Sequence, residues 1–200
     1  MNPKTLILAT HNKGKLAEVK AMLEPLGFEV VSAEDLDLED VEETGADFAQ
    51  NAALKAHHAA QKTQKLALAD DSGLCVEALD GAPGLYSARW CGAQRSAQTG
   101  IARVQEELEK VKDKKDNRAK LVCTMALAWP DGRTEVFEGS CAGTLVFPPR
   151  QVEDYGYGFD PIFQPEGLSK TFGEMPREDK AAFSHRAMAL KKVIAFLEGA

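Results

Sequence analysis

Residues 66–73, Leu66-Ala67-Leu68-Ala69-Asp70-Asp71-Ser72-Gly73, set four apolar side chains directly against two carboxylates, a hydroxyl and a glycine. A short apolar run of this kind is typical of a buried strand in an α/β sheet. Asp-Asp-Ser-Gly predicts a turn where that strand ends. Ligands of α/β sheets bind beyond the carboxyl ends of the strands, so two carboxylates are expected where such proteins do chemistry. An ordinary strand-to-turn junction uses the same residue types, and the remaining chain has to distinguish the two.

A strand, a polar loop and a helix precede this stretch. Residues 5–9 are apolar, residues 10–15 are polar and contain a glycine, and a helix is expected over residues 14–24. This order aims backbone N–H groups and a helix dipole at a phosphate. The spacing of a P-loop is absent, because Leu16 follows Gly14-Lys15.

The rest of the chain alternates helices and strands before it forms a hairpin. Further strands are expected at residues 28–31, 74–77, 121–127, 134–139 and 143–147, and further helices at 47–64, 96–111 and 184–198, the last capped by Ser184. The acidic residues 34–43 are expected to form a solvated loop, and His57 and His58 are expected to be solvated. The pattern predicts one α/β domain over residues 1–200 with a mixed sheet.

Composition restricts the class of protein. The 200 residues carry a formal net charge of −7, which argues against nucleic-acid binding through a basic face. No run of 18 apolar residues and no signal peptide core occurs, so we expect a cytoplasmic protein without a membrane segment. The four cysteines form no C-x-x-C pair, which argues against a zinc site.

Four polar groups remain to be explained together. The first is residues 10–15, the second is Glu43 with Asn51 and Lys55, and the third is residues 70–72. The fourth joins residues 157–160 to Lys180 and residues 184–186. Magnesium takes one or two carboxylates and leaves its other positions to phosphates and water. Lysines balance a triphosphate and an aromatic ring can face a base, so these are the parts of a magnesium–nucleotide site.

These groups lie within longer motifs that resemble one known family. The motifs are, in chain order, Ala9-Thr10-His11-Asn12-Lys13-Gly14-Lys15, Glu43-Thr44-Gly45, Phe48-Ala49-Gln50-Asn51-Ala52 with Lys55-Ala56, Ala69-Asp70-Asp71-Ser72-Gly73-Leu74, Gly81-Ala82-Pro83-Gly84 with Tyr86-Ser87-Ala88-Arg89, Gly158-Phe159-Asp160-Pro161-Ile162-Phe163, and Lys180 with Ser184-His185-Arg186. The chain closely resembles the inosine triphosphate pyrophosphatases, also called non-canonical purine NTP pyrophosphatases. Seven motifs in family order make the resemblance specific.

The resemblance implies magnesium-dependent hydrolysis of ITP, XTP and their deoxy forms to the monophosphate and pyrophosphate. It implies an elongated mixed-sheet α/β fold with two lobes around a central cleft, and a homodimer. It places the phosphates at Thr10, His11, Asn12, Lys13, Gly14, Lys15 and Lys55, and Mg²⁺ at Glu43 and Asp71. Asp71 also matches the proton acceptor, and Ser72 a substrate contact. Base contacts match Tyr157, Gly158, Phe159, Asp160, Lys180, His185 and Arg186, with Phe159 standing where relatives often carry Tyr.

Other interpretations stay open at this point. A phosphatase of the haloacid dehalogenase type needs an aspartate after the first strand, and residues 10–12 contain none. A Maf-like pyrophosphatase would prefer another base, and a nucleotide-sensing module would bind without cleaving. Adjacent residues on a strand face opposite sides, so only one of Asp70 and Asp71 is expected to reach the metal directly.

Overall fold

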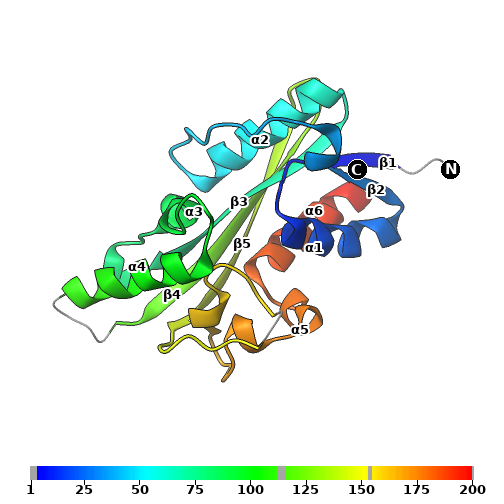
Figure 1. Ribbon diagram of the computed structural model, residues 1–200. Helices are drawn as coiled ribbons and strands as arrows, with labels where there is room; N and C mark the ends of the chain where they lie inside the picture. Colours follow the sequence, from blue (N-terminus) through cyan, green and yellow to red (C-terminus); the bar gives the residue numbers. More distant parts are fainter. Residues whose placement is uncertain (1–3, 112–115, 153–154, 200) are drawn as a thin grey trace. The chain divides into compact units, whose positions relative to one another are not determined.

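The computed structural model describes residues 4–111, 116–152 and 155–199 (Figure 1). Its six-stranded sheet has the order β2-β1-β3-β4-β5-β6. β1 pairs in parallel with β2 and with β3, and β5 pairs antiparallel with β6. The expected α/β class with a mixed sheet is therefore confirmed.

The strands are β1 (Lys4–Leu8), β2 (Phe28–Ser32), β3 (Leu66–Val76), β4 (Arg118–Ala128), β5 (Thr134–Leu145) and β6 (Phe163–Pro165). The α-helices are α1 (Lys13–Leu23), α2 (Phe48–Thr63), α3 (Ser87–Trp90), α4 (Ala97–Lys110), α5 (Arg177–Ala181) and α6 (His185–Glu198). Short 3-10 helices cover Glu24–Leu26, Glu34–Leu36, Glu77–Leu79, Gly84–Tyr86, Asp160–Ile162 and Phe172–Glu174. In the described ranges, no helix combines the length and the apolar character that crossing a membrane requires.

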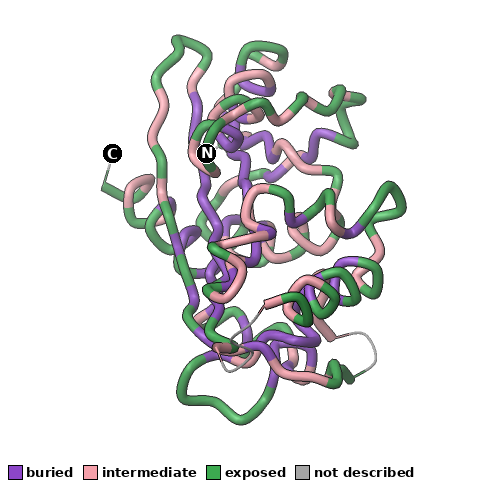
Figure 2. The backbone as a smooth tube through the Cα atoms, turned by 90° about the vertical axis from the view of Figure 1, so that its left-hand side faces the viewer, coloured by how far each residue is buried: buried purple, intermediate pink, exposed green. Residues whose placement is uncertain are grey.

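Two compact units share the chain. The first comprises Met1–Asp71, Cys123–Glu138 and Met188–Ala200, and the second comprises Ser72–Val122 and Gly139–Ala187. The boundaries fall inside β3, β4, β5 and α6, so the chain changes unit within regular elements. Figure 2 colours buried residues purple and exposed residues green; β3 and β4 are mostly buried, whereas β5 is exposed or half-buried in its first five residues and then alternates.

In the first unit, helices pack on both faces of β1 and β3. Strand side chains alternate between the two faces, and both faces of these strands carry apolar side chains. Leu6, Leu8 and Leu68 pack with Val19 and Leu23 of α1 and with Leu190 and Val193 of α6. Ile7, Ala67 and Ala69 pack instead against the alanine face of α2, formed by Ala52, Ala56, Ala59 and Ala60. Figure 1 shows α2 on the side of these strands opposite α1 and α6.

The second unit has its own apolar core. Ile101 and Val104 of α4 pack with Leu74 and Val76, which belong to the far half of β3. Phe159, Ile162, Phe163 and Phe172 complete that core from the segments around β6. The buried face of α4 repeats at helical spacing, and the Ser96 side chain accepts from the Thr99 N–H at its start.

The longer helices begin and end close to where the sequence predicts them. α2 covers Phe48–Thr63, and the Asp47 carboxylate accepts from the Gln50 N–H at 2.7 Å. α6 begins at His185, where Ser184 Oγ accepts from the Ala187 N–H at 3.2 Å. Side-chain caps of this kind satisfy N–H groups that the first helical turn leaves without a helical acceptor.

Several local predictions are wrong. β3 runs unbroken for 11 residues through Asp70-Asp71-Ser72-Gly73, so the predicted turn is absent there. β5 is one strand over Thr134–Leu145 rather than two, and its Gly143 permits the close approach of β6, since a Cβ there would lie 2.3 Å from the Gln164 carbonyl oxygen. His57 is not simply solvated, because its Nε2 lies 2.6 Å from Thr134 Oγ1.

Candidate functional site

The two adjacent carboxylates lie on β3 just beyond the end of a neighbouring strand. β1 ends at Leu8, which is in register with Leu68, and the Ala9 N–H donates to the Leu68 carbonyl at 2.8 Å. Asp70 and Asp71 therefore follow the part of β3 that pairs with β1. The two carboxylates lie at the carboxyl end of β1, as expected, but not at the end of β3, which continues to Val76.

Asp70 points to the side of β3 that carries α1. Its Oδ2 accepts from Lys15 Nζ at 2.8 Å, and Cys123 Sγ of β4 lies 3.8 Å from the same oxygen. Only 6% of Asp70 is exposed. A carboxylate this deeply buried is stable as an ion only with a close cation, which Lys15 supplies from the first turn of α1.

Asp71 points to the opposite side, toward α2. Asn51 Nδ2 donates to its Oδ2 at 3.0 Å, and Lys55 Nζ lies 3.9 Å from its Oδ1. Lys55 also donates to Glu43 Oε1 at 2.6 Å. Asn51 and Lys55 are four residues apart and so share one face of α2. The helix thus presents an amide and an ammonium to two carboxylates from different parts of the chain.

Burial and charge act in opposite directions in this group. Burial raises the pKa of Asp71 above its ordinary value, although Lys55 and the Asn51 hydrogen bond lower it in part. Burial lowers the pKa of Lys55, yet the neighbouring carboxylates of Asp70, Asp71 and Glu43 raise it above its ordinary value. Lys55 is therefore a firmly held cation, while Asp71 is a more basic carboxylate than an exposed aspartate.

Glu43 and Asp71 both face the Lys55 ammonium, so their oxygens converge on one positive charge. Carboxylate oxygen is the donor that Mg²⁺ prefers, and one or two carboxylates suffice when phosphates and water complete the octahedron. Over the described ranges, no group of three His, Cys, Asp or Glu side chains is placed to hold a metal. The donor set therefore fits Mg²⁺ that arrives with other oxygen ligands.

The segment Thr10 to Lys15 differs from its prediction. The helix starts at Lys13, so only the first three residues form a loop. Asn12 Oδ1 accepts from the N–H groups of Gly14 and Lys15 at 2.9 and 3.1 Å, and Thr10 Oγ1 accepts from the Asn12 N–H at 3.2 Å. These N–H groups, which we expected to face a phosphate, bond to side chains of the segment itself. Lys15 brings its ammonium to the group, while Lys13 is exposed.

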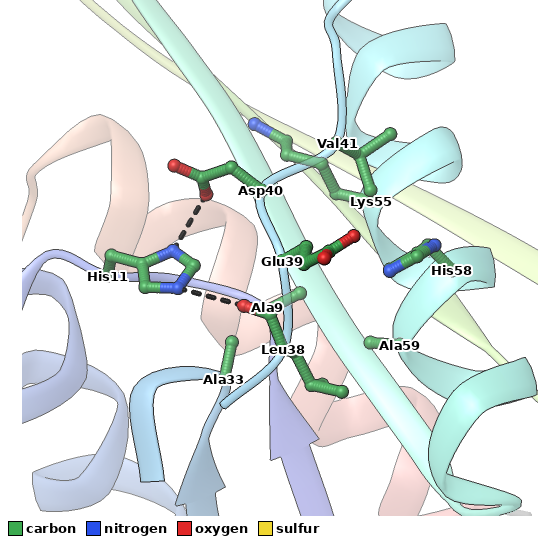
Figure 3. A pocket seen from close by; sticks show the side chains of 10 residues that line it. All are labelled: Ala9, His11, Ala33, Leu38, Glu39, Asp40, Val41, Lys55, His58 and Ala59. Atoms are coloured by element: carbon green, nitrogen blue, oxygen red, sulfur yellow. Dashed lines mark hydrogen bonds and ion pairs between the residues drawn. The ribbon is translucent and has the colours of Figure 1, made fainter. Parts of the chain in front are cut away.

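A pocket beside Lys55 contains residues that the sequence did not single out as a group. Figure 3 shows Lys55 and His58 on α2, with the segment around Asp40 facing that helix. His11 Nδ1 lies 2.7 Å from Asp40 Oδ1, and its Nε2 lies 3.2 Å from the Leu38 carbonyl oxygen. Both ring nitrogens of His11 therefore face oxygen atoms of the segment that lies against α2. The spacing of three between Lys55 and His58 on one helix was the available signal.

The second unit holds a separate polar group around Asp160. Its Oδ2 accepts from Lys180 Nζ at 2.5 Å and from the Tyr157 N–H at 2.8 Å. Asp160 and Lys180 are 3% and 4% exposed, so the pair is almost wholly removed from water. The carboxylate fixes both the lysine and the backbone of the glycine-rich loop, in which Gly158 has a φ of +61°.

Aromatic rings surround the cations of this group. Lys180 Nζ lies 4.6 Å from the ring centre of Tyr157 and 5.2 Å from that of Phe172. Arg186 donates to the Tyr157 hydroxyl and also lies over its ring. The His185 ring is 6.5 Å from that of Phe172. Phe172 was missed because nothing in its local sequence distinguishes it from an ordinary core residue.

The Ham1 family model matches residues 6–196. The chain belongs to the Ham1 family. It is 47% identical over 195 residues to the dITP/XTP pyrophosphatase of Zymomonas mobilis, covering 98% of this chain and 92% of that protein. It is 49% identical over 191 residues to the dITP/XTP pyrophosphatase of Rhodospirillum centenum, covering 96% and 93%. The predicted family resemblance is therefore confirmed.

Solved structures of Ham1 proteins have the same fold. The Coxiella burnetii Ham1 protein superposes with a TM-score of 0.90 at 36% identity, covering 98% of this chain and all of that one. The Staphylococcus aureus Ham1 protein gives a TM-score of 0.85 at 38% identity, covering 98% and 99%. Both solved structures are more than 35% identical to this chain over nearly its whole length, which supports the fold described above.

Two predicted site residues of the Ham1 chain take other positions than we expected. Phe159 belongs to the apolar core of the second unit, and the ring that lies beside Lys180 and Arg186 is that of Tyr157. Ser72 is partly buried in the middle of β3 rather than in a turn. The structure otherwise brings Lys15, Glu43, Lys55, Asp70 and Asp71 into one group, and Tyr157, Asp160, Lys180 and Arg186 into another.

Proposed function

We propose that this Ham1 chain hydrolyses non-canonical purine nucleoside triphosphates, namely dITP, XTP and ITP, to the monophosphate and pyrophosphate. This reaction removes them from the nucleotide pool. The observation that carries the proposal is the buried Asp71, held by Asn51 and facing Lys55, with Glu43 on the same lysine. Relatives that are 47% and 49% identical over nearly the whole chain bear the name dITP/XTP pyrophosphatase.

Asp71 is the proposed proton acceptor. Water is a poor nucleophile, and a carboxylate within hydrogen-bonding reach can take its proton as it attacks phosphorus. Burial raises the pKa of Asp71, which makes its carboxylate a stronger base than an exposed one. The Asn51 amide holds Asp71 Oδ2, so the other oxygen remains on the side of Lys55.

Lys15 and Lys55 are proposed to hold the phosphates. Each ammonium already lies against a carboxylate, at 2.8 Å from Asp70 and 2.6 Å from Glu43. These contacts orient both lysines, and phosphate oxygens would compete with the carboxylates for the ammonium protons. Glu43 and Asp71 would hold Mg²⁺, which supplies positive charge to the phosphates as pyrophosphate leaves.

Base recognition is proposed for the group in the second unit. Lys180, Arg186 and His185 are donors, and hypoxanthine and xanthine present a 6-oxo acceptor to donors. Adenine has an amino group at that position, which would leave buried donors without an acceptor, and such sites reject the wrong ligand by large factors. Tyr157 supplies an aromatic face beside the same cations.

The resemblance also supports proposals about the protein as a whole. We propose that residues 1–200 act as a single catalytic domain within a cytoplasmic homodimer. Its partner would be the nucleotide alone, without nucleic acid or membrane, which agrees with the net charge of −7. Sedimentation of the purified protein at several concentrations tests the dimer.

Product chromatography tests the activity. The protein is incubated with Mg²⁺ and dITP, XTP, ITP, dATP or dGTP, and the products are separated and quantified. Monophosphate and pyrophosphate from dITP, XTP and ITP, with little turnover of dATP, is the expected result; guanine also carries a 6-oxo group, so dGTP tests whether other contacts exclude it. Diphosphate plus inorganic phosphate as the products, or no turnover of dITP, XTP and ITP, would contradict the proposal.

A further inference from the structure

One buried amide connects the two proposed metal-binding segments. Asn51 is 3% exposed and lies in the first turn of α2. Its Oδ1 accepts from the Gly45 N–H at 2.7 Å, and its Nδ2 donates to Asp71 Oδ2 at 3.0 Å. The Gly45 N–H can only donate and an ionised carboxylate can only accept. Both partners therefore require the same orientation of the amide, with its oxygen toward Gly45 and its nitrogen toward Asp71.

The Gly45 contact brings the loop that carries Glu43 directly against the start of α2. A Cβ on Gly45 would lie 2.6 Å from Asn51 Oδ1 and 2.9 Å from the Asn51 nitrogen, so only glycine fits without a shift. Glu43 is two residues earlier, and its Oε1 accepts from Lys55 one helical turn beyond Asn51. The loop is thus tied to α2 both before and at Gly45.

We propose that Asn51 is a positioning residue that holds the Asp71 carboxylate and the Glu43-bearing loop in one fixed arrangement on α2. The inference rests on the proposed function, since it assigns Glu43 and Asp71 to Mg²⁺. Groups that orient metal ligands through hydrogen bonds typically affect metal affinity or activity about 10–100-fold when they are removed.

Few side chains can replace this amide. Asp at position 51 keeps an acceptor for the Gly45 N–H but presents a second carboxylate to Asp71 in place of a donor. Leu has nearly the same shape as Asn and satisfies neither partner. The two variants therefore separate the contact with the loop from the contact with Asp71.

Gln50 offers a matched control on the same helical turn. Its Oε1 accepts from the N–H of Ala46, the next residue of the same loop, at 3.0 Å, and its Nε2 donates to Asp47 at 3.2 Å. Gln50 is exposed, and both of its amide contacts lie near the helix start. Gln50→Leu thus loosens the loop at a neighbouring residue without removing the amide that Asp71 accepts from.

The experiment compares Asn51→Leu, Asn51→Asp and Gln50→Leu with the unmodified protein. Steady-state rates of dITP hydrolysis as a function of Mg²⁺ give kcat, KM and the apparent Mg²⁺ constant. Nuclear magnetic resonance gives the hydrogen-exchange rates of the Gly45 and Ala46 amides without nucleotide. Thermal melting identifies any variant that fails to fold cooperatively.

Both Asn51 variants are expected to lower kcat about 10–100-fold and to raise the apparent Mg²⁺ constant, while KM for dITP changes less. The Gly45 amide should exchange faster in Asn51→Leu and stay protected in Asn51→Asp. Gln50→Leu should accelerate exchange at Ala46 and leave kcat and the Mg²⁺ constant close to those of the unmodified protein.

The proposal is overturned if a folded Asn51→Asp variant keeps kcat and the apparent Mg²⁺ constant, or if Gln50→Leu reduces them equally. Unchanged Gly45 exchange in a folded Asn51→Leu variant would also overturn it. Should Asn51→Leu not fold, Asn51→Asp alone decides, because it retains the loop contact. Absence of dITP and XTP turnover in the unmodified protein would refute the proposed function instead, while the exchange rates would still report on the amide.

Discussion

Asp70 and Asp71 are neighbours with nearly equal burial, yet they point to opposite faces of β3 and contact different partners. Asp70 meets one cation at close range, with Lys15 Nζ at 2.8 Å. Asp71 meets an amide at 3.0 Å and a lysine that lies 3.9 Å away and is shared with Glu43. The carboxylate on the α1 side is therefore held by one close ammonium, whereas the carboxylate on the α2 side is oriented by an amide beside a lysine that it shares with Glu43.

This difference separates two roles that the sequence alone leaves together. A carboxylate in direct contact with one lysine orients that lysine. Burial raises the pKa of Asp71, so its carboxylate is a stronger base than that of an exposed aspartate. We infer that Asp71 contacts the reacting groups and that Asp70 acts through Lys15.

The largest expected effect is on catalysis. Asp71→Asn should lower kcat for dITP on the order of 10²–10⁴-fold, because it removes the proton acceptor and a proposed metal ligand. Asp70→Asn should cost roughly 10–100-fold, since it acts on Lys15. Steady-state rates with matched melting curves measure both, and a greater loss from Asp70→Asn would reverse the assignment of the two faces.

The ion pair on the α1 side should dominate stability. Lys15→Met leaves Asp70 buried without its close cation and should lower the free energy of unfolding by about 3 kcal/mol. Adding Asp70→Asn to that variant should restore most of the loss, because the buried negative charge is then removed as well. Urea unfolding of the two single variants and the double variant measures this, and additive losses would show that the pair is not coupled.

Arg186 lies on neither face of β3, and replacing it should change the choice of base. Arg186→Ala should reduce the preference for dITP over dATP roughly tenfold, because one donor to the 6-oxo group is lost. Its effect should be the same whether Asp70 is present or replaced by Asn. An unchanged ratio of kcat/KM for the two nucleotides would argue against Arg186 as a base-reading residue.

The smallest expected effect concerns pH and stability without metal. The pKa of Asp71 is higher in the folded protein than in the unfolded chain, so the unfolded chain releases this proton first. Stability that the protonated Asp71 contributes at low pH is therefore lost as pH rises through its folded pKa. Melting in EDTA across that range should show a smaller loss for Asp71→Asn than for the unmodified protein. An equal loss would mean that other groups account for the pH dependence.

The sequence predicted much of the secondary structure and named nearly all members of both polar groups. The helix predicted at 47–64 is Phe48–Thr63, because the alanine periodicity and the Asp47 cap are local features. The prediction from sequence was wrong at Asp70-Asp71-Ser72-Gly73, where residues typical of turns lie inside an extended strand. Their polar side chains are accommodated because Lys15, Asn51 and Lys55 arrive from distant segments, which no local propensity records.

By itself, the sequence determined the family, the mixed α/β class and the residue types of the site, since motifs and periodicity depend on neighbouring positions. Only the tertiary structure decided which cation meets which carboxylate. Alternation along β3 separates Asp70 from Asp71, but whether α1 or α2 covers a given face depends on how the helices pack. Packing within the second unit places Phe159 in its core and leaves the ring of Tyr157 beside Lys180 and Arg186. In the first unit, the position of α2 makes Asn51 the link between Asp71 and the Glu43 loop.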